Sequence, residues 1–434
     1  MLTNPVLISV LVMCILCLFK VNVLLAIMIS AVVAGLMADF TLGQTMGHLI
    51  GGMGGQSETA LSYILLGALA VGISQTGLAT ILSRKVEKVV GKNGKFFLLI
   101  LAAIACCSQN IVPIHIAFIP ILIPPLLSVM NDLKIDRRAA ACALTFGLKA
   151  PYIAIPAGFG LIFQGIIVKG LNENGMATGD LPVWKFMMIP ALGMLTGLLI
   201  AIFITYRKPR NYETREVSLG DSSEEVTDHF TMQHLGAGLG ALSAFGVQLA
   251  TGSLPLGALI GLIIMIIFKA IPFLQMDGTM NNGIKMMGFI AFVMLVASGF
   301  GNVIRETGGV AQIVEASAGI VGGSKFAAAF VMLLIGLVVT MGIGTSFGTI
   351  PIIATIYVPL CAHLGFSVAA TAILVGVAGA LGDAGSPASD STLGPTAGLN
   401  ADGQHNHIWD TCVPTFLHFN IPLIIFGTIA SLLV

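Results

Sequence analysis

Two aspartates, Asp383 and Asp390, lie in a stretch rich in glycine, serine and proline that spans residues 382–396. The stretch follows directly on an apolar run, residues 366–381. In a bilayer each unpartnered backbone group costs several kcal/mol, and a central aspartate costs about 2.5–3.5 kcal/mol on a lenient insertion scale. A helix-breaking, carboxylate-bearing segment at this place must therefore lie against protein or a wet cavity. We interpret it as an ion or substrate site.

The residue types around the two aspartates suit a small cation. On a continuous helix Asp383 and Asp390 would share one face, but the prolines and glycines disfavour a continuous helix. Hard cations such as Na+ prefer carboxylate and hydroxyl oxygens, so we predict a cation or proton site. The alternative is that the hydroxyls only cap the start of a helix, with Asp390 at the membrane interface. The hydroxyls concerned are those of Ser386, Ser389, Ser391 and Thr392.

Two further segments carry polar groups that can complete a site. One offers the hydroxyls of Thr345, Ser346 and Thr349, although a small-residue packing face is the alternative interpretation. In the other, Lys149 follows an apolar stretch, and we expect it to pair with Asp383 or to bind a substrate carboxylate, unless it snorkels to an interface. We assign substrate binding to Ser108, Gln109, Asn110, Lys149 and Thr345.

The composition places these residues in a membrane protein. The chain is 56% hydrophobic and 9% charged, whereas soluble domains carry about 25% charged residues. Six charge-free apolar runs approach the ~20 residues that cross a bilayer core, so the lipid bilayer is the expected partner. The zero formal net charge argues against a nucleic-acid partner. The runs are residues 21–38, 59–83, 186–206, 252–268, 286–304 and 413–434.

The distribution of basic residues predicts the orientation of the chain. Four connections are basic, whereas residues 39–58 and 171–184 contain no lysine or arginine. The positive-inside rule puts the basic connections in the cytoplasm. Both termini are therefore expected outside the cytoplasm, in a bacterial-type plasma (inner) membrane. The basic connections lie at Lys20 and at residues 84–95, 134–138 and 207–215.

Self-comparison indicates a duplication at offsets of 230 to 238 residues. An odd number of crossings separates the copies, which makes them inverted. A polar stretch between them holds ten of the forty charged residues, and we interpret it as a cytoplasmic linker, mobile or loosely helical. We therefore divide the chain into a first inverted transmembrane repeat, residues 1–206, the linker, residues 207–232, and a second repeat, residues 233–434. Lys95-Phe96 matches Lys325-Phe326, and Thr76-Gly77 matches Thr307-Gly308.

Helix-breaking segments recur at matching places, residues 108–113 with 342–351 and residues 146–160 with 382–398. Inverted halves with interrupted helices are typical of secondary transporters. The predicted fold is therefore an all-α polytopic membrane protein. It has two inverted-topology repeats, re-entrant hairpins and broken helices, in about 12–14 membrane segments.

The two glycine-containing motifs resemble those of a known family. Gly382-Asp-Ala-Gly-Ser-Pro-Ala-Ser-Asp-Ser-Thr392 is similar to the Gly-Asp-x-x-Ser-Pro-x-Ser-Asp-Thr-Thr segment of NhaC-type Na+/H+ antiporters. Gly344-Thr-Ser-Phe-Gly-Thr349 is similar to their Gly-Thr-Ser-Trp-Gly-Thr segment. That family belongs to the ion-transporter superfamily, whose fold is an inverted repeat with re-entrant hairpins. The resemblance implies a cation path lined by Ser346, Thr349, Asp383, Ser386, Ser389 and Asp390.

The chain departs from that pattern in ways that bear on substrate. Phe347 replaces the tryptophan, Ser391 replaces a threonine, and residues 394–410 resemble a branch described as amino-acid, notably histidine, permeases. We therefore predict a secondary active transporter, not an enzyme. We expect no cofactor and no metal other than a possible Na+. The coupling ion would be Na+ or H+. A cation-coupled permease for a small, histidine-like amino acid is preferred, because Lys149, Gln109 and Asn110 are groups that a simple exchanger does not require.

Three alternatives stay open at the level of sequence. The first is a Na+/H+ antiporter without an organic substrate. The second is a channel, although no symmetric filter is evident. The third is an intramembrane aspartyl protease, whose Gly-x-Gly-Asp motif is approached here with Ala380 in place of the first glycine. A homodimer is compatible with the sequence.

Overall fold

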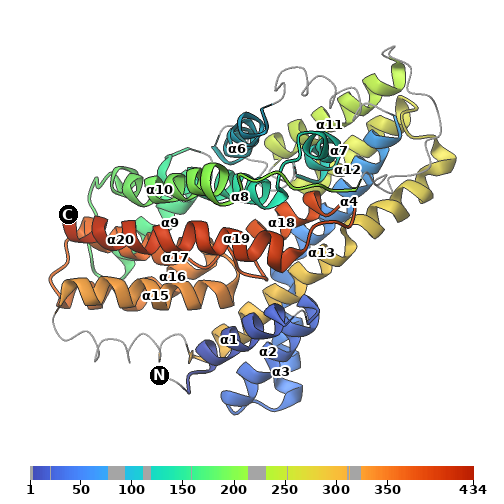
Figure 1. Ribbon diagram of the computed structural model, residues 1–434. Coiled ribbons are helices and arrows are strands. Elements are labelled where there is room, and N and C mark those ends of the chain that lie inside the picture. Colours follow the sequence, from blue (N-terminus) through green and yellow to red (C-terminus); the bar gives the residue numbers. More distant parts are fainter. Residues whose placement is uncertain are drawn as a thin grey trace.

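The computed structural model describes residues 3–19, 21–76, 93–110, 119–157, 159–213, 231–251, 253–309, 312 and 324–434. Every regular element in these ranges is a helix (Figure 1), which confirms the predicted all-α class. The first half contains α1 (Pro5–Leu18), α2 (Val23–Met37), α3 (Leu42–Met53), α4 (Ser57–Gln75), α6 (Gly94–Asn110), α7 (Ile119–Asp132), α8 (Arg137–Ala154), α9 (Phe159–Glu173) and α10 (Val183–Ile200).

The second half contains α11 (Met232–Thr251), α12 (Leu254–Ile267), α13 (Met276–Glu306), α15 (Lys325–Ile343), α16 (Ser346–His363), α17 (Val368–Ala380), α18 (Asp390–Leu399), α19 (Val413–Thr415) and α20 (Ile421–Leu433). Short π-helical segments extend α10 (Ala201–Thr205) and precede α20 (His407–Cys412 and Phe416–Asn420).

The helices repeat in order and in packing. Helices α2, α6, α8 and α9 begin 231 residues before α12, α15, α17 and α18 respectively. The contacts repeat when α7, α8 and α9 are matched to α16, α17 and α18. Helices α7 and α8 both pack against α18, and their counterparts α16 and α17 both pack against α9. The helix order and contacts therefore support the internal duplication. The inverted orientation of the halves and the domain boundaries remain predictions.

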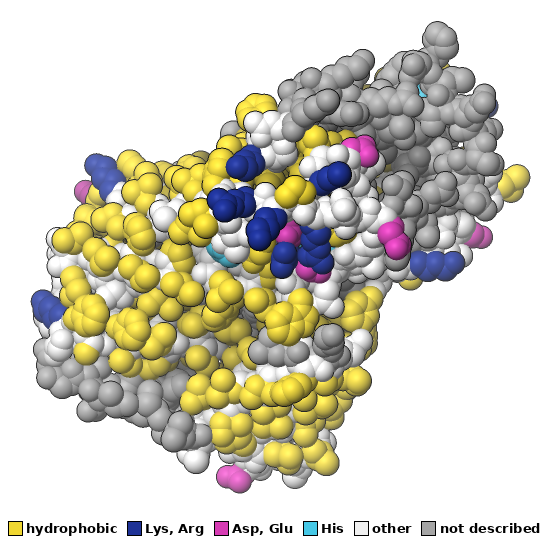
Figure 2. All heavy atoms as spheres, viewed as in Figure 1, with side chains coloured by type: hydrophobic (Ala, Val, Ile, Leu, Met, Phe, Trp, Pro, Cys, Tyr) yellow, Lys and Arg dark blue, Asp and Glu magenta, His cyan; other side chains and the backbone are white. Residues whose placement is uncertain are grey.

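The outer surface and the helix lengths are those of an integral membrane protein. Figure 2 shows an extensive face of hydrophobic side chains. Each of the six apolar runs contains or lies within a helix over most of its described residues. Five described helices are long and apolar enough to cross a membrane, or up to seven if two bent pairs each form one span. The five shorter apolar helices are each 10–17 residues long, so the predicted 12–14 segments stay a prediction.

Three of the four predicted interruptions lie in the described part of the chain. Helices α8 and α9 meet at a bend of 50°, α15 ends at Gly344 in the left-handed conformation, and residues 381–389 separate α17 from α18. Gly382 has a φ of 78°, and a Cβ there would lie 2.3 Å from a backbone oxygen, so only glycine fits. The fourth interruption extends into residues 111–118, outside the described residues.

The beginning of the predicted linker, residues 207–213, forms an extended strap. The backbone N–H of Arg137 donates to the Tyr212 hydroxyl at 3.0 Å, and Glu213 and Gln404 exchange two hydrogen bonds of 2.7 and 2.8 Å. The prediction of a mobile or loosely helical segment is therefore wrong for the strap, because its polar groups find partners on α8 and on the turn after α18. Most of the remaining linker lies outside the described residues.

Candidate functional site

Side chains stabilise the break between α17 and α18 by forming hydrogen bonds with the backbone of the break. The buried side chain of Asn420 accepts from the N–H of Gly382 at 2.9 Å and donates to the carbonyl of Ala384 at 2.6 Å. The hydroxyl of Ser389 donates to the carbonyl of Asp383 at 2.6 Å. These contacts satisfy backbone groups that a broken helix leaves without partners, and they fix the position of Asp383.

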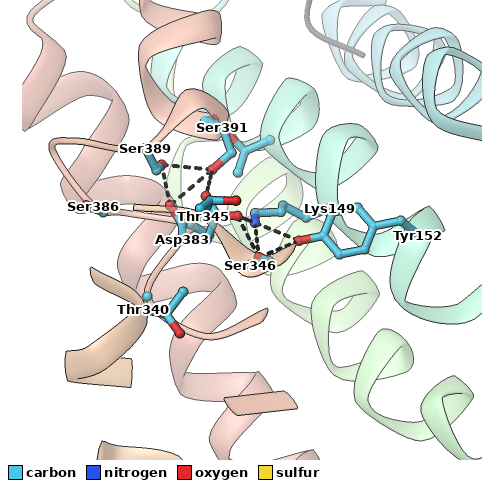
Figure 3. Close-up of polar contacts among 12 residues, drawn as sticks. Lys149, Tyr152, Thr340, Thr345, Ser346, Asp383, Ser386, Ser389 and Ser391 are labelled. Carbon is cyan, nitrogen blue, oxygen red and sulfur yellow. Dashed lines mark hydrogen bonds and ion pairs between the residues drawn. The ribbon is translucent and has the colours of Figure 1, made fainter. Parts of the chain in front are cut away.

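The carboxylate of Asp383 is buried and has three side-chain partners (Figure 3). Ser346 donates to Oδ2 at 2.7 Å, and Ser391 donates to Oδ1 at 2.9 Å. The Lys149 ammonium forms an ion pair with Oδ2. Ser346 opens α16 and Ser391 lies in the first turn of α18, so the ends of two helices converge on one carboxylate.

Lys149 comes from the first half of the chain and joins the two halves. Its ammonium donates to the hydroxyl of Tyr152 at 2.7 Å and to that of Ser346 at 2.9 Å, in addition to contacting Asp383. The residue is only 2% exposed. The predicted pairing of Lys149 with Asp383 is therefore confirmed, and the snorkelling alternative is wrong.

A cavity of about 210 Å³ lies beside this ion pair. One wall is aromatic, with the ring of Phe347 centred 5.4 Å from that of Tyr152 and 6.4 Å from that of Phe159. Asp390 lines both this cavity and a neighbouring one of about 160 Å³ that reaches Arg305. The space thus brings together a cation, carboxylates and aromatic rings.

The structure brings some of the predicted site residues together and not others. Thr345 lines both cavities, as Asp390 does. Ser389 occupies the position before α18 and bonds to backbone. Ser386 donates to a backbone carbonyl at 3.2 Å, and Thr349 donates to the carbonyl of Thr345 at 2.7 Å, so both hydroxyls are engaged within the helical framework.

Some predicted substrate residues cannot be compared with the cavity, and some residues that line the cavity were not predicted from the sequence. Ser108, Gln109 and Asn110 form the end of α6, and their side chains lie outside the described set. Sequence reasoning missed Tyr152, Phe159 and Gln56, all of which line the 210 Å³ cavity. Tyr152 was detectable as the polar aromatic residue one helical turn after Lys149, whereas nothing in the sequence distinguished Gln56.

A second buried ion pair ties the other end of α18 to α8. The guanidinium of Arg137 forms two bonds of 2.6 Å with the carboxylate of Asp402, and their side chains are 0% and 2% exposed. Burial by itself raises the pKa of Asp402, but hydrogen bonds and charge from Arg137 outweigh burial and lower it. Nearby, Arg210 of the strap pairs with Asp410 at 2.9 Å.

The histidines of this region are integrated into the same structure. His407 shares hydrogen bonds with the carbonyl of Pro387 at 2.9 Å and with the hydroxyl of Thr396 at 2.8 Å. His405 shares one with Thr411 at 2.7 Å. The turn after α18 is therefore joined by a hydrogen bond to the break that carries Asp383, through His407 and the carbonyl of Pro387.

Comparison with known families matches residues 143–428 to a profile described as the Na+/H+ antiporter family. The chain belongs to the Na+/H+ antiporter family. A second profile of Na+-H+ antiporters matches residues 4–90. The first match includes Lys149, Ser346 and Asp383, so the ion-pair site lies inside the region that defines membership of this transporter family.

Relatives of this family member extend over its whole length. It is 50% identical to an uncharacterised membrane protein of Vibrio parahaemolyticus, with 99% of each chain covered. It is 46% identical to YuiF of Bacillus subtilis, provisionally named an amino acid transporter, again with 99% of each covered.

Two solved structures are similar at low identity. One is the YdaH transporter of Alcanivorax borkumensis, with 12% identity, a TM-score of 0.44 and coverage of 90% and 88%. The other is MtrF of Neisseria gonorrhoeae, with 16% identity, a TM-score of 0.44 and coverage of 89% and 84%.

Proposed function

We propose that this transporter is secondary active and uses a Na+ or H+ gradient to carry a small amino acid. The observation that carries the proposal is the buried contact between Lys149 and Asp383 beside a cavity. Ionisable residues inside a membrane protein are costly and generally mark a transport path. The pair bridges the two halves of the chain, which are the parts that move relative to one another in transporters built from repeats.

The size of the cavity favours an organic solute. Its volume is about 210 Å³, whereas a water molecule takes about 30 Å³ of liquid and an engineered cavity of about 150 Å³ binds benzene. By that scale there is room for roughly seven to eight non-hydrogen atoms, as in an amino acid of the size of valine. The aromatic wall of Tyr152, Phe159 and Phe347 would contact its side chain.

The charges suggest how binding of solute and ion would be coupled. A substrate carboxylate would bind the ammonium of Lys149, and a substrate ammonium would face Asp390. Lys149 would then be shared between the substrate and Asp383, or withdrawn from Asp383. The buried carboxylate of Asp383 would lose its counter-charge, which is costly unless the carboxylate takes up a proton or Na+. The hydroxyls of Ser346 and Ser391 remain as oxygen ligands for that ion. Each ligand therefore raises the affinity for the other, as reciprocal coupling requires.

Na+/H+ antiport without an organic substrate is the second candidate, and the family assignment favours it. In that case an ion and the Lys149 ammonium would compete for the carboxylate of Asp383. The two candidates differ in whether the aromatic side of the cavity is used.

The test is transport in proteoliposomes that contain the purified protein. Accumulation of labelled amino acids, with valine and threonine tested beside histidine, is measured under a Na+ or a pH gradient. We expect Asp383→Asn to abolish gradient-driven accumulation, and Lys149→Gln to weaken solute binding. The matched exposed variants Asp180→Asn and Lys169→Gln should transport normally. Normal accumulation by Asp383→Asn would contradict the proposal. Na+-dependent proton movement with no effect of any amino acid would establish antiport.

A further inference from the structure

A third cavity lies away from the ion-pair site, where several helix ends meet. Its volume is about 400 Å³, and it is formed by the start of α6, the turn between α7 and α8, and the strap that follows α10. Four cationic side chains line this cavity, and we call the cavity the basic recess. They are Lys95, Lys134, Arg207 and Lys208.

The basic recess has a large excess of positive charge. The carboxylate that lines it belongs to Asp136, which already accepts a 2.6 Å hydrogen bond from Arg138 and lies 3.7 Å from Arg210. Within the described residues, no ion pair involves the four lining cations. All four side chains are exposed, so an anion can approach them. Figure 2 shows Lys and Arg side chains gathered on this face of the molecule.

The basic recess also borders exposed apolar surface. Phe96 follows Lys95 at the start of α6 and is 47% exposed, while Phe203 and Ile204 near the end of α10 are 40% and 64% exposed. The ammonium of Lys95 lies 5.4 Å from the centre of the Phe203 ring. Cations at the ends of apolar helices, next to lipid-facing side chains, are the arrangement expected at a membrane interface.

We propose that the basic recess binds the phosphate headgroup of an anionic phospholipid, with its acyl chains over the apolar faces of α6 and α10. The charge excess alone fits a free phosphate equally well, but the adjoining apolar surface favours a ligand that has both a phosphate and a hydrocarbon part. The backbone N–H of Arg210 donates to the carbonyl of Lys134 at 3.0 Å. A bound headgroup would thus contact the two segments, the turn and the strap, that this hydrogen bond joins.

The test measures lipid retained by the intact purified protein with native mass spectrometry. Phosphatidylglycerol, phosphatidylcholine and inorganic phosphate are titrated separately. The variant Arg207→Gln/Lys208→Gln removes two recess cations and should weaken phosphatidylglycerol binding roughly twenty-fivefold, since each cation near an anionic lipid contributes about fivefold. The exchange Arg207→Lys/Lys208→Arg keeps the charge and should retain binding.

A control outside the recess separates its effect from that of general surface charge. Lys269 and Lys285 are exposed and do not line the recess, so Lys269→Gln/Lys285→Gln should bind phosphatidylglycerol normally. Equal losses in both double variants, or no loss in either, would overturn the proposal. Inorganic phosphate that binds as tightly as phosphatidylglycerol and displaces it would replace the lipid with a free anion and would also overturn it.

Discussion

Replacement of Asp402 by asparagine tests how strongly α18 is held to α8. In the native protein the guanidinium of Arg137 is fully buried and bonded at 2.6 Å to both oxygens of the Asp402 carboxylate. Asp402→Asn preserves the shape of the side chain but removes its charge. Arg137 then becomes a buried cation without a counter-charge.

The structure sets the size of the effect. Removing one partner of a buried ion pair costs about 3–5 kcal/mol. Arg137 would keep its bonds to the carbonyl of Leu399 and to the side chain of Asn131, both 3.0 Å long. We therefore expect the lower figure, about 3 kcal/mol, which lowers the folding equilibrium constant roughly a hundredfold.

Unfolding of the purified protein by denaturant in mixed micelles measures this cost. The exposed Asp132→Asn, close by at the end of α7, is the matched control and should change stability by less than about 0.5 kcal/mol. The double variant Arg137→Met/Asp402→Leu replaces both charges by apolar groups and should recover most of the loss. A loss below about 1 kcal/mol in Asp402→Asn, or additive losses in the double variant, would refute the reasoning.

Three further outcomes follow from the described contacts. Asn420→Ala leaves the N–H of Gly382 and the carbonyl of Ala384 without their partner, so we expect a loss of about 2–5 kcal/mol in unfolding free energy and reduced transport. Gly382→Ala should abolish transport in the proteoliposome assay, because its Cβ would collide with the carbonyl of Leu337; wild-type flux would disprove this. The pKa of Asp402 is lowered in the folded state, so its contribution is present above the ordinary aspartate value of about 3.9 and is lost as pH falls through the folded value. Acid should therefore reduce the stability of the wild type more than that of Asp402→Asn, measured by unfolding from pH 7 downwards.

The helix break was predictable from the sequence because local chemistry determines it. Glycines and prolines after an apolar run prevent a continuous membrane helix. A buried carboxylate then requires a partner, and Lys149 was one of few cations inside an apolar stretch. The break depends only on a short segment, but Lys149 and Asp383 lie 234 residues apart, so their pairing stayed one of several open interpretations until the packing decided it.

The second ion pair could not be found in the same way. Arg137 belongs to a basic connection, and we used its charge to predict orientation rather than burial. Only the packing of α8 against α18 buries it. Likewise, the hydroxyls of Ser386 and Thr349 were assigned to a cation path by their type, whereas their direction depends on which carbonyl lies closest. Residue type indicates a chemical capacity, and the tertiary contacts decide whether it is used in a site.

The two ion pairs hold α8 and α18 side by side in an antiparallel arrangement. Arg137, at the start of α8, holds Asp402 just beyond the end of α18, while Lys149, near the end of α8, holds Asp383 just before its start. Between them Thr145 donates to the carbonyl of Ser391 at 3.0 Å. Twelve residues of helix place the two α8 cations about 18 Å apart. Any movement that separates α18 from α8 must break at least one pair. Under the proposed function, a ligand and a coupling ion would replace the lysine partner of Asp383 and free that end, while the pair of Arg137 and Asp402 would still hold the other end.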